Sequence, residues 1–236
     1  MLRFITDFDG PIIDVSERYY RVYQFCLENT RYSNQEVKQL SKAEFWDLKR
    51  SQIPEKQIGM ISGLDETQAQ EFSKIRRQII HTEEYFQYDT LASGAVDALL
   101  KVQQAGVDLA VLTMRRVWEL DYALQKFHLS RFFPENRCYC LSNDYVKTRD
   151  IEDKPLLMGR AIEELPPVAD TWMVGDTEAD ITAAVKHGIK VMAVECGIRD
   201  RSQLELHQPN LIVKDLRSAV DLLLQSFGQG SYPGGR

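Results

Sequence analysis

Two carboxylates stand at the end of a short apolar run near the start of the chain. Asp7 and Asp9 flank Phe8, and Gly10 follows them after the apolar run at 2–5. Side chains two apart on a strand share a face, so both carboxylates converge while Phe8 points the other way. Like charges this close repel unless a cation lies between them or one is protonated, and either arrangement can support catalysis. A polar strand end capped by an Asp-Gly turn would also produce this pattern.

Two further reactive side chains are expected at the ends of regular elements. Thr113 directly follows an apolar run that ends at Leu112, so its hydroxyl is expected at the same sheet edge as Asp7. Lys154 precedes Pro155, and because proline favours the first helical position, Lys154 is expected in the loop before that helix. Taken alone, either residue could be an ordinary strand-end threonine or surface lysine.

A second pair of carboxylates follows the apolar run at 172–174. Gly175 is followed by Asp176 and, four residues later, by Asp180. In a helix that begins near Thr177, these two acids share one face. An N-cap aspartate and a first-turn acid would explain one of them, whereas a pair beside a glycine turn favours a functional site.

Short apolar runs alternate with amphipathic stretches after residue 90, which predicts a parallel sheet covered by helices on both faces. The expected strands cover residues 2–6, 107–112, 137–141, 171–174, 190–194 and 210–213. The expected helices cover residues 94–104, 116–127, 155–164, 178–186 and 215–225. The predicted fold class is therefore α/β, a three-layer Rossmann-like parallel sheet core, with the insertion described next.

The first crossover is too long for a single helix, because Asp9 and Asp108 stand 99 positions apart. Residues 14–88 are expected to form an inserted all-helical cap domain, and residues 1–13 and 89–236 the core. Two apolar stripes at helical spacing support this interpretation, and they are expected to form core rather than a binding surface: Tyr19, Val22, Tyr23 and Cys26; Phe72, Ile75 and Ile79. The insert leaves the sheet at its carboxyl edge, so it is expected to act as a lid over ligands bound there.

Composition excludes several classes of protein. The net charge is −6 and no long basic run occurs, which argues against a nucleic-acid partner. No apolar run approaches the ~20 residues of a membrane span, and no signal peptide precedes the first strand, so a cytoplasmic location is expected. The four cysteines are too few for a disulfide framework. The tail at 228–236 is expected to fray.

The chain resembles the haloacid dehalogenase superfamily in its reactive residues and in their order. That order is the first Asp pair, the threonine, the lysine and the second Asp pair. Within it, the chain resembles the phosphoglycolate phosphatase-like branch, in which a helical cap follows the first strand. The resemblance covers nearly the whole chain and includes the stretches 91–113 and 175–197. It implies that Asp7 attacks phosphorus and becomes an aspartyl phosphate, while Asp9 acts as general acid and base. The implied reaction is hydrolysis of a small phosphorylated metabolite.

The same resemblance implies a cofactor and roles for the remaining residues. Mg²⁺ would be held by Asp7, the backbone carbonyl of Asp9, and Asp176. Thr113 and Lys154 would grip the phosphoryl oxygens, and Asp180 would reach the metal through water or orient Lys154. Because true dehalogenases lack an aspartate two residues after the nucleophile, Asp9 argues against carbon–halogen cleavage. As an acid, Asp9 must hold a proton part of the time, which usually requires a raised pKa.

Some residues depart from the family pattern. Pro11 stands where threonine or serine is usual and biases Gly10 toward extended backbone, and Met114 and Arg115 replace the usual small or amide residues. Arg115 is a candidate substrate contact, although a solvated arginine would look the same.

A capped phosphatase must also recognise the rest of its substrate, which makes Lys49 and Arg50 in the expected lid candidate substrate contacts. A charged pair more often marks a solvated face. The four histidines fall outside every motif and are assigned no catalytic role: His81, His128, His187 and His207.

Three other activities remain open at the level of the sequence. A phosphomutase uses the same core but returns the phosphoryl group to its substrate. A phosphonate hydrolase would need a lid lysine that forms an imine, for which Lys49 is the candidate. A binding module that has lost catalysis would fit the departures at Pro11 and Met114.

Overall fold

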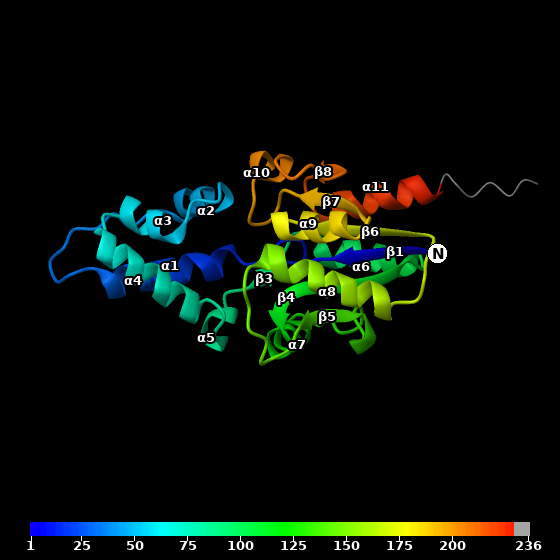
Figure 1. The fold of residues 1–236 in the computed structure, drawn as a ribbon, viewed down its shortest axis with the longest axis horizontal. Helices are drawn as coiled ribbons and strands as arrows, with labels where there is room; N and C mark the ends of the chain where they lie inside the picture. The colour runs from blue at the N-terminus through cyan, green and yellow to red at the C-terminus, as the bar shows by residue number, and fades with distance from the viewer. Residues whose placement is uncertain (229–236) are drawn as a thin grey trace, which may run out of the picture.

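A six-stranded parallel sheet forms the core of the protein (Figure 1). The computed structural model describes residues 1–228, so the tail predicted to fray lies outside the described residues from position 229 onward. In spatial order the strands are β5 (Cys138–Leu141), β4 (Asp108–Arg116), β1 (Leu2–Thr6), β6 (Asp170–Gly175), β7 (Lys190–Val194) and β8 (Leu211–Val213). The chain order reverses around β1, which is where ligands bind in open parallel sheets.

Helices cover both faces of this sheet. One face carries α6 (Ala95–Gln104), α7 (Val117–Lys126) and α11 (Leu216–Gly228), and the other carries α8 (Asp150–Glu164), α9 (Glu178–Lys186) and α10 (Arg201–Glu205). Successive side chains of β1 point to opposite faces of the sheet. Phe4 therefore lies in the apolar core under α6, α7 and α11, and Ile5 lies in the core under α8, α9 and α10. The predicted three-layer α/β class is confirmed.

Five helices lie between β1 and the rest of the core, as the length of the first crossover predicts. They are α1 (Ser16–Thr30), α2 (Lys42–Arg50), α3 (Glu55–Ile61), α4 (Glu66–Ile79) and α5 (Glu83–Phe86). Val22, Tyr23, Cys26 and Phe72 from the predicted stripes are buried in an apolar core of their own. The two connections between this helical insert and the sheet pair with each other as short antiparallel strands, β2 (Ile13–Asp14) and β3 (Thr90–Leu91). The sequence did not predict these strands.

One helix boundary was wrong at the level of the sequence. The helix expected to begin at Pro155 begins at Asp150, so Lys154 lies within α8 and not in the loop before it. Asp150, Glu152 and Asp153 in the first turn favour helix formation through the helix dipole, and Pro155 forfeits only one backbone hydrogen bond this close to the helix start.

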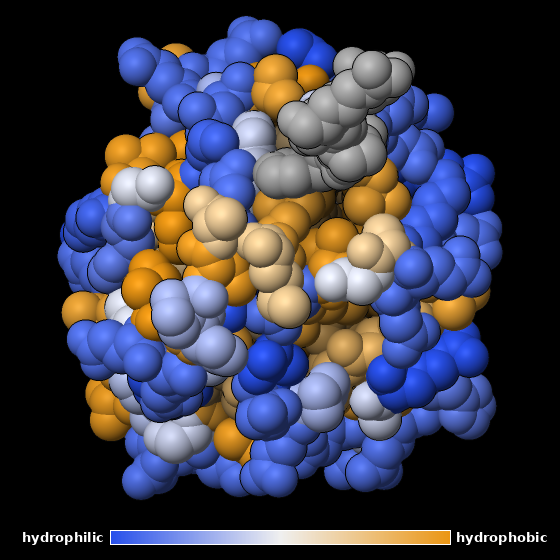
Figure 2. Space-filling view, turned by 90° about the vertical axis from the view of Figure 1, so that its right-hand side faces the viewer, coloured by the Kyte–Doolittle hydropathy of each residue, from blue (hydrophilic) through white to orange (hydrophobic). Residues whose placement is uncertain are grey.

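The insert occupies one end of the molecule, next to the carboxyl edge of the sheet (Figure 1). Figure 2 shows the opposite end, where hydrophobic residues lie between hydrophilic ones. Within residues 1–228, no helix has the length and apolar character that crossing a bilayer requires. The residues that could do chemistry gather at the edge of the sheet that faces the insert.

Candidate active site

A cavity of about 250 Å³ lies between the carboxyl edge of the sheet and the insert. The core lines it with side chains from all four motifs: Asp7, Asp9, Thr113, Lys154 and Asp176. The insert contributes Tyr19, Lys49, Arg76 and His81. Residues from distant parts of the sequence therefore meet around one space, as the four motifs predict.

Asp7 and Lys154 form an ion pair on the floor of this cavity. Lys154 Nζ lies 2.8 Å from Asp7 Oδ2 and 2.5 Å from Asp180 Oδ1, and all three side chains are buried. The backbone amide of Phe8 donates to Asp7 Oδ1 at 2.7 Å, which fixes the carboxylate after β1 ends. Lys154 therefore bridges a carboxylate of the first motif and one of the last.

Asp180 is held mainly by its own helix. Its Oδ2 accepts hydrogen bonds from the Thr177 hydroxyl at 2.7 Å and the Thr177 amide at 3.1 Å, a capping box at the start of α9. With its other oxygen on Lys154, Asp180 has little free coordination capacity. These contacts favour the alternative in which it orients Lys154.

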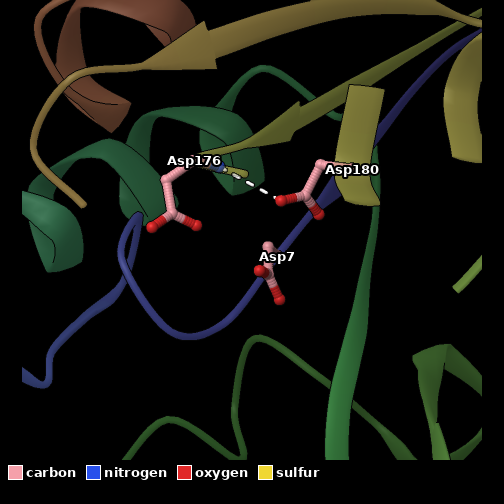
Figure 3. Close-up of side chains that lie close together, drawn as sticks. All are labelled: Asp7, Asp176 and Asp180. Carbon is pink, nitrogen blue, oxygen red and sulfur yellow. Dashed lines mark hydrogen bonds between the residues drawn. The ribbon is translucent and has the colours of Figure 1, made fainter. Parts of the chain in front are cut away.

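Asp176 faces the same space with one oxygen unused. Its Oδ2 accepts from the amide of Ile198 at 2.6 Å, whereas its Oδ1 is buried without a hydrogen-bond partner. Oxygens of Asp7, Asp176 and Asp180 lie within 4.8 Å of one another, and Figure 3 shows the three carboxylates around a common space. Such an array of hard oxygen atoms fits a divalent cation.

Two glycines allow Asp176 to approach the first motif. Gly10 has a φ of +93°, which favours glycine, and a Cβ there would lie 2.3 Å from Asp176 Cγ. A Cβ on Gly197 would lie 1.9 Å from Asp176 Oδ2. Both positions must lack a side chain for the carboxylates to converge.

Burial and mutual repulsion shape the protonation of this cluster. The pKa of Asp7 is raised well above its usual range, because burial and the Asp180 charge outweigh the attraction of Lys154. Burial and the Asp180 charge also raise the pKa of Asp176 to about 7. Three ionised carboxylates would outnumber the one lysine, so the cluster favours bound protons or an added cation.

Asp9 belongs to a different electrostatic arrangement, a closed ring of two carboxylates and two guanidiniums. Asp9 Oδ1 accepts from Arg115 Nε at 2.9 Å, and Asp9 Oδ2 accepts from Arg18 Nη2 at 3.1 Å. Asp89, where the chain leaves the insert, pairs with the same arginines, through Oδ1 with Arg18 at 2.9 Å and through Oδ2 with Arg115 at 2.6 Å. Arg18, Asp89 and Arg115 are each at most 2% exposed.

The ring keeps Asp9 ionised, whereas a general acid is expected to hold a proton part of the time. Although burial alone would raise it, the guanidiniums of Arg115 and Arg18 lower the pKa of Asp9 to about 2. Both oxygens of Asp9 accept from cations, so the carboxylate is ionised in this arrangement. It can donate a proton only after it exchanges a guanidinium for another partner.

The other predicted contacts divide into two groups. Thr113 is buried beside the cavity, where its hydroxyl accepts from the amide of Arg115 at 3.2 Å, and Lys49 also lines the cavity. Arg115 lines it too, although its guanidinium is engaged with Asp9 and Asp89. Arg50 is absent from the lining, because its guanidinium donates to the carbonyl of Glu195 at 2.7 Å and thereby joins α2 to the core.

Sequence reasoning missed several cavity residues from the insert. His81, to which the sequence assigned no role, lines the cavity. Its burial and the nearby charge of Arg18 lower the pKa of His81 well below the usual range. Tyr19, expected in the insert core, and Arg76 also face the cavity. A one-sided apolar stripe cannot reveal such residues, because their exposure depends on how the insert docks on the sheet.

Comparison with known proteins identifies the family of the chain. The sequence profile of the haloacid dehalogenase-like hydrolases matches residues 4–194. Pyrophosphatase PpaX of Oceanobacillus iheyensis is 21% identical over 94% of this chain and 97% of its own length. A phosphoglycolate phosphatase of Pseudomonas fluorescens is 21% identical over 59% of this chain and 50% of its own. A solved haloacid dehalogenase-like hydrolase from Streptococcus pneumoniae superposes with a TM-score of 0.67 at 17% identity, covering 94% of this chain and 97% of the other.

The chain belongs to the haloacid dehalogenase-like hydrolase family, as its motifs indicate. Its relatives include phosphatases acting on two different phosphorylated compounds, and the chain is an enzyme of this phosphatase type.

Proposed function

We propose that this protein is a Mg²⁺-dependent phosphatase that hydrolyses a small phosphorylated metabolite through an aspartyl phosphate on Asp7. The observation that carries the proposal is the buried Asp7–Lys154 pair beside Asp176 at the floor of a small cavity. A carboxylate nucleophile divides one difficult displacement into two easier steps. The cavity of about 250 Å³ suits a small substrate.

The donor set fits the proposed metal. Asp176 Oδ1 is a buried oxygen without a partner, and it lies close to oxygens of Asp7 in a cluster whose three carboxylates outnumber its one lysine. Asp7, the backbone carbonyl of Asp9 and Asp176 would hold Mg²⁺, and Asp180 would act through Lys154. Bound there, Mg²⁺ would neutralise the repulsion between an anionic nucleophile and an anionic substrate.

The protein's own groups supply the remaining steps. Asp7 Oδ would attack phosphorus, while Lys154 Nζ and the Thr113 hydroxyl would bind the phosphoryl oxygens. Asp9 would protonate the leaving oxygen and then take a proton from the attacking water. Since Arg18 lies on α1 of the insert and Arg115 on β4 of the core, opening of the insert for substrate entry would free one oxygen of Asp9, which could then take up a proton from water. The leaving oxygen of the substrate would take the place of Arg18 beside Asp9 when the insert closes again.

The division into domains is part of the same proposal. Residues 14–88 would act as a lid on a core of residues 1–13 and 89–236, and lid closure would exclude bulk water during phosphoryl transfer. The contacts of Arg50 with Glu195 and of Ser51 with Asp200 would hold the lid against the core.

Magnesium should change the stability of the protein in a pH-dependent way. A pKa of Asp176 raised from 3.8 to about 7 in the folded state contributes stability that is present below about pH 4 and lost as the pH rises through 7. We therefore expect the Tm of the metal-free protein to fall between about pH 5 and pH 8. Added Mg²⁺ should raise the Tm more at the higher pH, because it binds the deprotonated carboxylates.

Thermal unfolding of Asp176→Asn checks this expectation without any activity assay. The variant should be more stable than the wild type without metal at about pH 8, and it should lose most of the Mg²⁺-dependent shift. Asp97→Asn, at an exposed acid on α6, is the matched control and should keep the full shift. An undiminished Mg²⁺ shift in Asp176→Asn would remove Asp176 from the metal site.

The fate of the phosphoryl group separates hydrolysis from the mutase reaction. We expect Mg²⁺-dependent release of inorganic phosphate from a panel of phosphorylated metabolites that includes phosphoglycolate and pyrophosphate. An isomeric sugar phosphate as the main product, with little inorganic phosphate, would favour a phosphomutase. Absence of turnover on the whole panel would favour a binding module.

A further inference from the structure

Charge is distributed unequally across the cavity. On the core side, Asp7 and Asp180 share Lys154, and within residues 1–228 no cationic side chain lies within 4.0 Å of the carboxylate oxygens of Asp176. On the insert side, Lys49 and Arg76 share the single carboxylate Glu55, with Arg76 Nε 3.1 Å from Glu55 Oε1 and Lys49 paired to the same oxygen. Carboxyl groups therefore outnumber cations on the core side, whereas cations outnumber carboxylates by one on the insert side.

Two further cavity cations, which belong neither to the Asp9 ring nor to the Asp7 cluster, each have a carboxylate of their own. Arg199 makes a two-pronged pair with Glu178, with both contacts at 2.8 Å, and Lys147 pairs with Asp150 at 3.1 Å. Within residues 1–228, no carboxylate except Glu55 lies within 4.0 Å of the side-chain nitrogens of Lys49 or Arg76. The uncompensated positive charge thus belongs to these two residues.

Their burial makes this excess charge significant. The side chains of Lys49, Glu55 and Arg76 are only 11%, 15% and 21% exposed. The Arg76 guanidinium lies over the Tyr19 ring at 4.9 Å, and Lys49 Nζ lies 5.9 Å from the same ring, so both cations flank one aromatic wall of the cavity. A buried net charge is costly unless an opposite charge joins it, and the open direction for such a partner is the cavity.

We propose that Lys49 and Arg76 bind a second anionic group on the leaving-group side of the substrate, and that the preferred substrates are small phosphate esters or anhydrides with an anionic leaving group. This inference rests on the proposed phosphatase function, because it places the phosphoryl group on Asp7 and the leaving group toward the insert. A carboxylate and a second phosphate are the two possible sources of that anion. Arg76 suits either, since its planar guanidinium can bind two oxygens at once.

Substrates with charged and neutral leaving groups test the proposal. Phosphoglycolate and pyrophosphate carry the anion, and phosphoglycolamide replaces the carboxylate of phosphoglycolate by a neutral amide of the same shape. The wild type should favour at least one of the anionic substrates over the amide by about 10- to 100-fold in kcat/KM, the usual effect of a hydrogen bond to a charged group. Whichever substrate shows the preference identifies the anion as carboxylate or phosphate.

Lys49→Met and Arg76→Met should lower kcat/KM for the preferred anionic substrate by about 10- to 100-fold and should lower it much less for the amide, so that the preference is lost. Each single substitution leaves Glu55 paired with the other cation, so both variants should fold. Arg77→Met, at the exposed neighbour of Arg76 on α4, is the matched control and should keep the wild-type preference. An equal loss of kcat/KM on all substrates would mean that the two cations only hold the insert together, and the proposal would be wrong.

A binding measurement separates failure of this inference from failure of the proposed function. Phosphonoacetate carries both anionic groups and cannot be hydrolysed as an ester, whereas methylphosphonate lacks the carboxylate. With Mg²⁺ present, the wild type should bind phosphonoacetate at least about 10-fold more tightly, and either methionine variant should equalise the two affinities. Equal wild-type affinities, together with no preference for pyrophosphate over the amide, would overturn the inference even if the protein is a phosphatase. Unequal affinities without hydrolysis would support it while the proposed function fails.

Discussion

Asp7→Asn is expected to reduce phosphate release by at least about 10⁴-fold, the scale on which removal of a nucleophile acts in covalent catalysis. The amide cannot form an acyl phosphate of comparable reactivity, so the first of the two displacement steps is lost. Because asparagine keeps an oxygen that can accept from Lys154, the local geometry should persist.

The same variant should not lose stability. Burial and the Asp180 charge hold the pKa of Asp7 well above its usual range, which shows that the ionised carboxylate is disfavoured at this position. The neutral amide removes that repulsion, so we expect a Tm equal to or above that of the metal-free wild type near neutral pH.

Phosphate release and thermal unfolding, measured on one preparation, check both expectations. Asp153→Asn is the matched control, because Asp153 is a buried aspartate next to Lys154 whose oxygens bond to Tyr145 and Thr148 outside the cavity. It should retain turnover within a few fold. If Asp7→Asn kept a tenth or more of wild-type turnover while remaining folded, Asp7 would not be the nucleophile.

The parts of the site that the sequence predicts share a physical basis. Asp7 and Asp176 each follow a buried apolar strand, Thr113 lies within β4 after the buried apolar run at 109–112, and the carboxyl ends of adjacent parallel strands meet at one edge. Their convergence follows from strand order alone. The length of the first crossover likewise requires an insert at that edge, whatever its internal structure.

The parts that the sequence does not predict depend on docking between separate elements. Tyr19 belongs to the same stripe as the buried Val22 and Tyr23, yet it faces the cavity because α1 is covered by the core at that end. His81 follows the end of α4 in a connection without any motif. Nothing in the local pattern distinguishes such a residue from one in solvent.

Arg115 shows that the sequence also fails to predict long-range ion pairs. An arginine after a strand is expected to be solvated, but here its partners Asp9 and Asp89 lie 106 and 26 residues away along the chain. The expected raised pKa of Asp9 fails for the same reason, since no local feature predicts two buried guanidiniums beside it. Long-range ion pairing becomes visible only when the insert and the core are placed together.

Arg115→Met is expected to lower the free energy of unfolding near neutral pH by about 3–5 kcal/mol, the usual cost of breaking a buried ion pair from one side. The substitution leaves Asp9 and Asp89 with Arg18 as their shared cation. Methionine fills a similar volume and can still pack against Phe8 and Phe86, which the guanidinium contacts in the wild type. The loss should therefore report the missing charge and not a cavity.

The pH dependence of this loss has a definite sign. The pKa of Asp9 is lowered from 3.8 to about 2 in the folded state, so its pairing contributes stability that is present above about pH 4 and lost as the pH falls through 2. The stability difference between wild type and Arg115→Met should thus shrink as the pH falls from about 4 toward 2. Urea unfolding at a series of pH values measures it.

Two further variants distinguish the ring from a generic effect of removing a buried arginine. Arg3→Met removes another buried arginine, but its partner Asp108 keeps Arg137 at 2.8 Å, so the cost should be smaller. Adding Asp89→Asn to Arg115→Met restores one carboxylate for one guanidinium and should recover a large part of the lost stability. Equal destabilisation by Arg3→Met and Arg115→Met, without recovery in the double variant, would show that the four charges do not act as one unit. If the double variant recovers stability but not turnover, the ring has two separate roles. The fold then needs only balanced charge, whereas catalysis needs Asp9 held where the leaving group departs.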